Sequence, residues 1–495
     1  MSKIIIQNGN MCELDLPLKF AQKLYNEFAI RHPNAFYLRT RQRGMQNWDG
    51  KIHYITKTGQ FKIGLLPKVY DMCIEMGIKP KVVDMRQPLP KVSKVVTKIG
   101  KYKLRPEQEK AVKAVINNTI GGKPFHIGVL DYTVNAGKTL IMSSLYLSYK
   151  KQLKTLLITN DSDWLNQARE EFKQYLPGED ITFVQGKVLN WSNFTIGMVQ
   201  SISRNMRFYQ KELSQIDMVL IDEADQGGSR QYQNVITRLF NTRIRIGLSG
   251  TIYMSKLAKD KVKNMNLECF FGKVLAEFKL RDSIKKGYST KTVVKMVPGK
   301  PWYGNWESDC ISYKEIYDDS ITNSYTAWLM AYSRLRWNIN QGRYPALVVC
   351  KHIAHCENLY KFFKKKLGDA YNIAYVHVNT KSKLRQQIMK DFRDGKIDIL
   401  VSTTIIARGK NFPKLRYLLN AASMDSQEKS IQFLGRLVRT DKSKKKVYLD
   451  DLHYPGNYLD RHGKHRKQYY QRQELKVILL DKLWKKHPNH SLIQS

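Results

Sequence analysis

The chain has 495 residues, which is too long for one ordinary hydrophobic core and predicts about three domains of roughly 150 residues each. Hydrophobic residues make up 42% and aromatic residues 11% of the sequence, and these values exclude a wholly disordered chain. The formal net charge is +41, from 84 Lys and Arg against 43 Asp and Glu, and an excess of this size attracts polyanions such as nucleic acid.

A membrane is the competing anionic partner, and the sequence argues against it. The basic residues are scattered through the chain and not gathered on one amphipathic helix. No run reaches 18 apolar residues, and the first 17 residues lack the pattern of a signal peptide. The six cysteines lack the spacing of a disulfide framework, which favours a reducing compartment. We therefore expect a soluble, monomeric, cytoplasmic protein that does not bind membranes.

Residues 1–95 are predicted to form a small α+β module. Segments 51–55 and 61–66 have the composition of strands on either side of a turn, and 67–76 that of a helix. The proline-rich stretch 87–90, followed by basic residues, predicts a linker that ends the module.

From residue 96 the pattern changes to apolar strands that alternate with helices, once over 96–285 and again, after a linker, over 286–450. The predicted buried strands are 126–130, 154–159, 194–199, 218–221 and 244–248, then 346–350, 373–378, 397–402 and 416–420. Continuous apolar strands separated by helices indicate parallel sheets covered on both faces. We therefore predict an α/β protein with two tandem doubly wound lobes. Residues 451–495 are predicted to form a basic extension with a helix near 466–486.

A phosphate-binding loop is predicted after strand 126–130. In Ala136-Gly137-Lys138-Thr139 the backbone N–H groups and the Lys138 ammonium would hold the β- and γ-phosphates of ATP, and the Thr139 hydroxyl would contact Mg²⁺. Tyr132 stands where the general pattern has its first glycine, so the motif is incomplete.

Two acids end the buried strand 218–221. Asp222 is predicted to hold the Mg²⁺ shell and Glu223 to polarise the attacking water. Phosphoryl transfer also needs positive charge on the transferring group, and Arg436 and Arg439 lie three residues apart on a predicted helix. Gln432 precedes Arg436 by one turn and would touch the γ-phosphate or the water.

Six ordered motifs over residues 104–450 resemble those of superfamily 2 helicases. Besides the phosphate loop, the acidic strand end and the Gln432–Arg439 segment, they are Arg105 with Gln108 on the adenine side, Ser249 with Thr251 as the coupling motif, and Thr403 to Asn411, in which Gly409 would contact the nucleotide. The resemblance implies two RecA-like lobes and ATP hydrolysis with Mg²⁺.

The letters Asp-Glu-Ala-Asp at 222–225 favour an RNA helicase, but other motifs favour DNA. Ser249-Gly250-Thr251 and the spacing of Gln432, Gly435, Arg436 and Arg439 are closer to the DNA-acting RecG and XPB group. Segment 43–52, followed by 64–67, is similar to the amino-terminal domain of UvsW-type phage helicases. That resemblance implies remodelling of forks and Holliday junctions in phage replication, recombination or repair, within the host cytoplasm. An RNA helicase and the duplex translocase of a restriction-type system stay open as alternatives.

Hydroxyl, amide and amino groups at strand ends position phosphates without reading bases. The predicted nucleic-acid contacts of the lobes are Thr159, Asn160, Gln200, Ser201, Lys351, Thr403 and Thr404. Those of the first module are Arg43, Trp48 and Lys51, and the tail offers Arg461, Lys464, Arg466 and Lys467 to duplex arms. We expect removal of residues 1–95 to reduce the preference for branched DNA more than the ATPase activity.

Overall fold

The structure is a computed structural model that describes residues 2–42, 45–149, 152–186, 188–253, 258–299, 312–407 and 412–480. The chain forms two compact units. The first comprises Met1–Tyr132 and Ala136–Phe278, and the second comprises Thr133–Asn135 and Lys279–Ser495. Each unit is built around its own large sheet.

The large sheet of the first unit has the strand order β14-β13-β15-β12-β16-β17-β11-β18. Neighbouring strands are parallel except β14, which runs antiparallel to β13 at the edge. The bounds are β11 His126–Tyr132, β12 Thr155–Thr159, β13 Ile181–Gln185, β14 Val188–Leu189, β15 Phe194–Met198, β16 Met218–Asp222, β17 Ile244–Ser249 and β18 Val274–Phe278. The five predicted strands of this lobe are confirmed. β13 and β18 were not predicted, because strands that are only partly buried lack a continuous apolar run.

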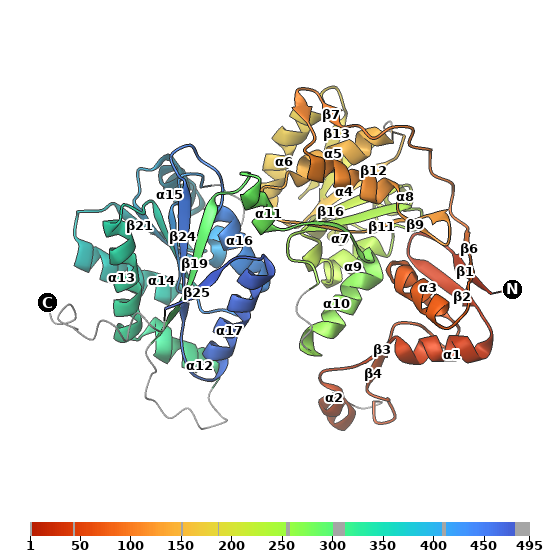
Figure 1. Ribbon diagram of the computed structural model, residues 1–495, viewed down its shortest axis with the longest axis horizontal. Coiled ribbons are helices and arrows are strands. Elements are labelled where there is room, and N and C mark those ends of the chain that lie inside the picture. The colour runs from red at the N-terminus through yellow and green to blue at the C-terminus, as the bar shows by residue number, and fades with distance from the viewer. Residues whose placement is uncertain are drawn as a thin grey trace. The chain divides into compact units, whose positions relative to one another are not determined.

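Helices cover both faces of this sheet (Figure 1). α4, α5 and α6 lie on one face, whereas α7, α9 and α10 lie on the other. The bounds are α4 Pro106–Ile116, α5 Lys138–Ser148, α6 Ser162–Tyr175, α7 Val199–Arg204, α8 Gln210–Ser214, α9 Arg230–Ile236 and α10 Ala258–Phe271. The buried central strands follow from this covering, because neither face of the sheet meets water.

The amino-terminal part of this unit is a small α+β module. Its four-stranded sheet has the order β5-β2-β1-β6, and a separate two-stranded sheet pairs β3 with β4. The bounds are β1 Lys3–Ile6, β2 Met11–Asp15, α1 Leu18–Glu27, β3 Ala29–Arg31, α2 Ala35–Arg41, β4 Lys51–His53, β5 Gln60–Lys62, α3 Leu66–Glu75 and β6 Lys81–Asp84. The strand predicted over 61–66 ends at Lys62, because a 3₁₀ turn over Ile63–Leu65 starts α3.

This module packs against the large sheet through a shared hydrophobic core. Ile4, Phe61 and Val69 of the module belong to the same buried cluster as Leu239 and Phe271 of the sheet and its helices. The approach is closest at Gly64, where an added Cβ would lie 2.1 Å from the Glu268 carbonyl oxygen. The residue must therefore lack a side chain for α10 to pack here. The module and the large sheet form one packed body.

The large sheet of the second unit is parallel throughout, with the order β21-β22-β20-β23-β24-β19-β25. The strand bounds are β19 Lys291–Pro298, β20 Ala346–Cys350, β21 Ile373–Val376, β22 Ile399–Thr403, β23 Tyr417–Asn420, β24 Lys446–His453 and β25 Val477–Leu479. The helix bounds are α11 Leu280–Lys285, α12 Tyr313–Tyr317, α13 Tyr325–Asn340, α14 Ile353–Leu367, α15 Ser382–Asp394, α16 Gln427–Leu437 and α17 Asn457–Arg472. The four predicted strands are confirmed, and with them the α/β class with two tandem parallel sheets.

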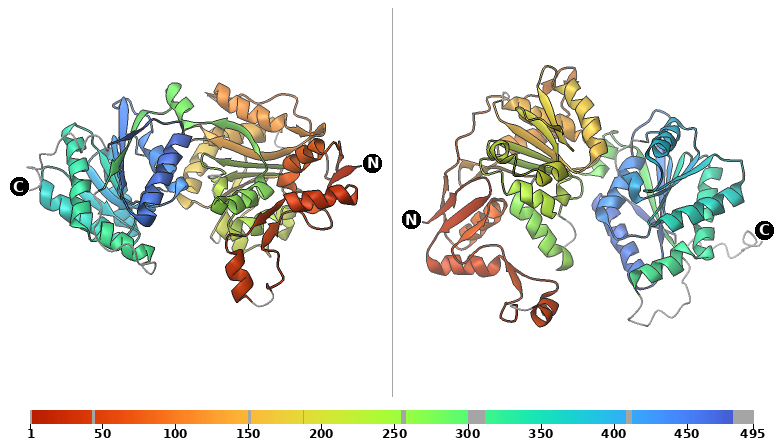
Figure 2. Two further views of the ribbon diagram at one scale, coloured as in Figure 1. Left: turned by 60° about the horizontal axis from the view of Figure 1, so that its bottom comes forward. Right: turned by 180° about the vertical axis from the view of Figure 1, so that it is seen from behind.

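Two separate cores lie on the two faces of this sheet. α13 and α14 pack on one face, where Val348 and Leu419 point, and α16 and α17 pack on the other, where Leu347 and Leu418 point. Both views in Figure 2 have the sheet between these two pairs of helices. The helix predicted near 466–486 is wrong over residues 473–480: α17 ends at Arg472, and Val477–Leu479 join the sheet beside β19. Residues 481–486 of that prediction lie outside the described residues. Within the described residues, no helix is long and apolar enough to cross a membrane.

Candidate active site

The phosphate loop connects β11 to α5, which begins at Lys138. Gly137 has φ +72°, a left-handed conformation that side chains rarely adopt, and a Cβ there would lie 2.3 Å from the Gln108 Nε2. The Gln108 amide donates to the Ala136 carbonyl oxygen at 2.8 Å and accepts from the Arg105 backbone N–H at 2.9 Å. Gln108, which was predicted together with Arg105 on the adenine side, therefore braces the phosphate loop.

Asp222 lies at the carboxyl end of β16, beside this loop. Its Oδ1 is 3.8 Å from the Lys138 Nζ, and its side chain is 5% exposed. Burial raises the pKa of Asp222, and the nearby Lys138 ammonium opposes that rise. The same Oδ1 is buried without a hydrogen-bond partner. A buried carboxylate oxygen without a hydrogen-bond partner, next to the amino-terminal end of α5, fits a divalent cation that carries nucleotide phosphates.

Glu223 follows in a left-handed conformation with φ +53°. Its Oε2 accepts a hydrogen bond from the Gln226 Nε2 at 3.2 Å. Two residues further, the Asp225 Oδ1 accepts from the Ser249 hydroxyl at 2.6 Å, and that hydroxyl also accepts from the Thr251 backbone N–H at 3.0 Å. The predicted coupling residues are therefore bonded to the acidic strand end, because β16 and β17 are neighbours in the sheet.

A polar chain that the sequence did not reveal links Glu223 to two predicted nucleic-acid contacts. The Asn160 side chain donates to the Gln226 Oε1, and the Gln200 Nε2 donates to the Asn160 carbonyl oxygen at 3.4 Å. These residues follow the adjacent strands β12, β16 and β15, whose carboxyl ends meet at one edge. The sequence signal was only a glutamine directly after the acidic tetrapeptide.

The other predicted contacts of this lobe are less accessible. Thr159 is 1% exposed, and its hydroxyl accepts from the Asp161 backbone N–H at 3.2 Å. Ser201 is 9% exposed, and its hydroxyl accepts from the Gly186 backbone N–H at 2.9 Å. Both hydroxyls are used inside the protein, whereas Asn160 and Gln200 are partly exposed.

In the amino-terminal module, Lys51 lines a groove of about 510 Å³ together with the cationic Arg31 and Arg39 and the exposed ring of Phe36. The Trp48 indole N–H donates to the Lys51 carbonyl oxygen at 2.9 Å, which holds the turn before β4. The predicted contact Arg43 and the predicted nucleotide contact Gly409 lie outside the described residues.

In the second unit, Gln432 and Arg436 share α16 as predicted. Arg439 does not share it: the helix ends at Leu437, and the Arg439 carbonyl oxygen accepts from the Thr290 hydroxyl at 3.1 Å.

The predicted phosphate contacts of the second unit follow the strands β20 and β22. Lys351 lies with its Nζ 4.0 Å from the centre of the Tyr313 ring, and burial lowers its pKa. Thr403 ends β22 and is 7% exposed, and the Lys429 Nζ donates to the Thr404 hydroxyl at 3.3 Å.

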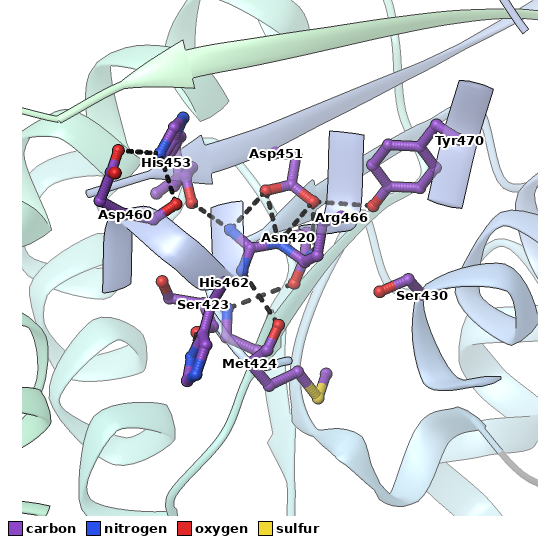
Figure 3. A network of polar contacts seen from close by, with 12 residues as sticks. Asn420, Ser423, Met424, Ser430, Asp451, His453, Asp460, His462, Arg466 and Tyr470 are labelled. Carbon is purple, nitrogen blue, oxygen red and sulfur yellow. Dashed lines mark hydrogen bonds and ion pairs between the residues drawn. The ribbon is translucent and has the colours of Figure 1, made fainter. Parts of the chain in front are cut away.

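Arg466 was predicted to hold a duplex arm, and the structure corrects this. It is fully buried on α17. Its Nε and Nη2 are 2.9 and 2.8 Å from the Asp451 Oδ1, and Nη1 donates to the Met424 carbonyl oxygen at 3.0 Å (Figure 3). Tyr470 and Asn420 also donate to Asp451. The network fixes the loop that leads into α16, which a surface cation could not do.

Two family models match the chain. That of the type III restriction enzyme res subunit covers residues 101–254, and that of the helicase conserved C-terminal domain covers residues 331–441. A helicase 22 of the Sulfolobus islandicus filamentous virus is 23% identical over 71% of this chain. The chain spans 64% of the length of that relative, which is less than two thirds.

Solved structures are similar as well. An HsdR subunit fragment of a type I restriction enzyme from Vibrio vulnificus aligns over 87% of this chain and 77% of that one, with a TM-score of 0.57 and 14% identity, which shows a common fold. UvsW of bacteriophage T4 aligns over 97% of this chain and 98% of that one at 18% identity, with a TM-score of 0.44 that by itself carries no conclusion. The two family models occur in the order of two RecA-like lobes, and the chain belongs to the superfamily 2 helicases.

Proposed function

We propose that the protein is an ATP-dependent DNA helicase or translocase that remodels branched DNA, such as forks and Holliday junctions. The observation that carries the ATPase part is the pair formed by Lys138 and the buried Asp222 beside the phosphate loop. This pair supplies one cation for phosphate oxygens and one carboxylate oxygen without a hydrogen bond for a metal ion.

The residues present fit a Mg²⁺–ATP complex. Asp222 and Thr139 would hold the metal, and Gly137 and Lys138 the phosphates. When bound, Mg²⁺ neutralises charge on the phosphates and makes the γ-phosphorus easier to attack. Glu223 would orient the attacking water and accept its proton, and Gln226 donates a hydrogen bond to that carboxylate. Gln432, Arg436 and Arg439 of the second unit would stabilise charge on the transferring phosphoryl group.

The coupling of hydrolysis to movement would run through contacts at the carboxyl edge of the first sheet. Ser249 bonds Asp225 directly, so a change in the acidic strand end alters the end of β17 as well. Asn160 and Gln200 lie at the same edge, where amide groups would hold a phosphate backbone without reading bases.

DNA is favoured over RNA by the motif resemblance at 249–251 and 432–439, and branched DNA by the resemblance at 43–52. A groove lined by Arg31, Arg39 and Lys51 in that module would suit a phosphate backbone. A duplex-DNA translocase of a restriction-type system is the second candidate, because the restriction-enzyme model matches residues 101–254.

The deciding experiment is the ATPase rate of the full chain with equal nucleotide concentrations of single-stranded, linear duplex, forked and four-way DNA, and of single-stranded RNA. Forked and four-way DNA should stimulate most, and unwinding or junction migration should follow with the same substrates. Greatest stimulation by RNA would identify an RNA helicase. Equal stimulation by linear and branched duplex, without strand separation, would identify a duplex translocase.

A further inference from the structure

A cluster of cations and aromatic rings lies on α13, β19 and β24 of the second unit. Trp337 of α13 is 42% exposed, and three cationic groups approach its ring. The centroid is 4.9 Å from the Lys295 Nζ, 5.0 Å from the Arg334 Cζ and 4.6 Å from the Arg343 Cζ. Three cationic groups around one ring repel one another, and a nearby anion offsets that repulsion.

Tyr448 extends this cluster on the neighbouring strand β24. The Arg343 Cζ lies 3.6 Å from the centre of the Tyr448 ring, and its Nη1 donates to the Asn338 Oδ1 at 2.9 Å. The Lys446 Nζ lies 5.7 Å from the same ring. The Arg343 guanidinium is thus held in a fixed plane, which suits recognition of a phosphate.

The charges of the cluster do not balance. Arg334 forms an ion pair with the buried Asp450 at 2.7 Å. Within the described residues, Lys295, Arg343 and Lys446 have no carboxylate at ion-pair distance. Lys291 adds a further cation, because it lies opposite Lys446 in the register of β19 and β24.

The titration of Lys295 fits that imbalance. Burial lowers its pKa, Asp450 opposes this, and Arg334, Arg343 and Lys446 lower it further. A bound anion would relieve the repulsion among these groups.

The cluster lies at the amino-terminal ends of the strands, whereas the predicted nucleic-acid contacts lie at their carboxyl-terminal ends. Lys291 and Lys446 are the first residues of β19 and β24, and Arg343 comes shortly before β20. Lys351 and Thr404 follow the last residues of β20 and β22. Since all strands of the sheet are parallel, the amino-terminal edge that carries the cluster is a separate surface.

We propose that this cluster, formed by Lys291, Lys295, Trp337, Arg343, Lys446 and Tyr448, binds the sugar–phosphate backbone of a second segment of nucleic acid. That segment is an arm of the substrate that lies outside the strand path along the carboxyl edge. Cations neutralise its phosphates, and the exposed Trp337 ring contacts a sugar or base. The inference rests on the proposed function only in taking nucleic acid as the substrate.

The test compares two double charge reversals of the full chain. K291E/K446E changes the cluster. K361E/K390E is the control: it makes the same change in net charge at exposed positions of α14 and α15, two helices that contact the edge strand β21. Lys291 and Lys446 lie opposite one another as like charges, and two glutamates keep a pair of like charges at the same positions. Thermal unfolding shows whether the variant keeps its fold. W337A is a third variant that keeps the charge.

Binding is measured at several salt concentrations with two DNAs. One is forked DNA with long arms, and the other is a single strand short enough to occupy only the path along the carboxyl edge of the sheet. K291E/K446E should weaken fork binding about tenfold or more, and reduce the slope of log affinity against log salt by about 2. It should leave the short strand unaffected, while W337A should weaken fork binding about fivefold. Equal effects of the two double reversals, or an equal loss for both DNAs, would overturn the proposal. If only an acidic polypeptide distinguishes the variants, the surface serves a protein partner and the proposal is wrong.

Binding is read without ATP turnover, so this result is separable from the proposed activity. If the wild-type chain lacks ATPase activity and K291E/K446E still loses fork binding, the proposed binding surface is supported and the proposed ATP-driven function is contradicted.

Discussion

Asp450 and Asp451 are consecutive residues of β24, and each is neutralised on a different face of the second sheet. Arg334 of α13 donates to the Asp450 Oδ2 at 2.7 and 2.9 Å, whereas Arg466 of α17 holds Asp451 from the other side. Successive side chains of a strand point to opposite faces, so each of the two adjacent buried carboxylates meets an arginine of its own. One strand thereby ties together the helices of both faces.

Replacing Arg466 by Met should destabilise the protein, because Asp451 would stay buried without its cation. The loss of one partner of a buried ion pair costs about 3–5 kcal/mol of unfolding free energy. The measurement is chemical unfolding followed by circular dichroism. Arg461→Met on the same helix is the control, since Arg461 is exposed and should change stability by less than about 0.5 kcal/mol. Equal stability of both variants would show that Arg466 is not the support of this loop.

Replacing Asn10 by Ala should destabilise the first unit. Arg245 is fully buried on β17, where burial lowers its pKa to about 9, and it donates to Asn10 Oδ1 and to the Gly9 carbonyl oxygen, both at 2.7 Å. Loss of the Asn10 acceptor leaves a buried charged donor unsatisfied, at a cost of about 1–3 kcal/mol. Asn8→Ala serves as a comparison in thermal unfolding, because among the described residues the Asn8 side chain accepts only local backbone bonds.

The same contact changes what we expect from deleting residues 1–95. The deletion would remove both Arg245 acceptors in the module and more than a third of the buried residues of the shared core. ATPase activity should therefore fall together with the branched-DNA preference, because the remaining lobe unfolds. If the truncated chain unfolds as cooperatively as the full one, we would instead expect the selective loss of substrate preference that was predicted from the sequence. Lys51→Ala and Arg39→Ala in the groove test substrate preference without this defect.

Replacing Lys138 by Ala should abolish ATP hydrolysis and leave nucleic-acid binding intact. The ammonium is the cation nearest to Asp222 in the loop, and without it the phosphates lose a charge-assisted contact. A steady-state ATPase assay and a filter-binding assay on one preparation separate the two effects. Lys154→Ala, an exposed lysine of the same unit, should keep both activities. Full turnover by the Lys138 variant would disprove the assigned site.

Replacing Gln226 by Ala should uncouple nucleic-acid binding from hydrolysis. Gln226 connects Glu223 to Asn160, so its loss removes one hydrogen bond to a charged group. We therefore expect the stimulation factor to fall about tenfold. The factor is the ratio of ATPase turnover with and without saturating DNA, which a general loss of folded protein does not alter. Asn160→Ala should have the same effect, and the double variant should add little to either. Gln233→Ala, which bonds only the Gly228 carbonyl oxygen among the described contacts, is the matched control.

Lys444 should make stability rise with pH in the alkaline range. Burial lowers its pKa from 10.5 to about 8, Asp441 opposes this, and Arg416 adds to it. Between pH 8 and 10.5 the unfolded chain binds a proton that the folded chain does not, so unfolding becomes less favourable as pH increases. The unfolding free energy of the wild type minus that of Lys444→Met should increase with pH by at most about 1.4 kcal/mol per pH unit. A flat or falling difference would contradict a buried, neutral amine.

The sequence by itself determined the parts of this protein that rest on local pattern. Nine buried strands were predicted because continuous apolar runs need no knowledge of neighbours, and the phosphate loop and acidic strand end were predicted because their spacing is set by a strand–loop–helix unit. β24 was not predicted, since Asp450 and Asp451 interrupt its apolar run and only the arginines of α13 and α17 make their burial possible.

Tertiary structure alone decided which polar residues meet. Arg466 has the sequence signature of a surface cation in a basic tail, yet it is buried, because its partner Asp451 comes from a strand of the sheet. Gln226, Asn160 and Gln200 come together only because three parallel strands end at one edge. Charge and composition predict that a chain will seek nucleic acid, but distances across a fold decide which side chains are free to touch it.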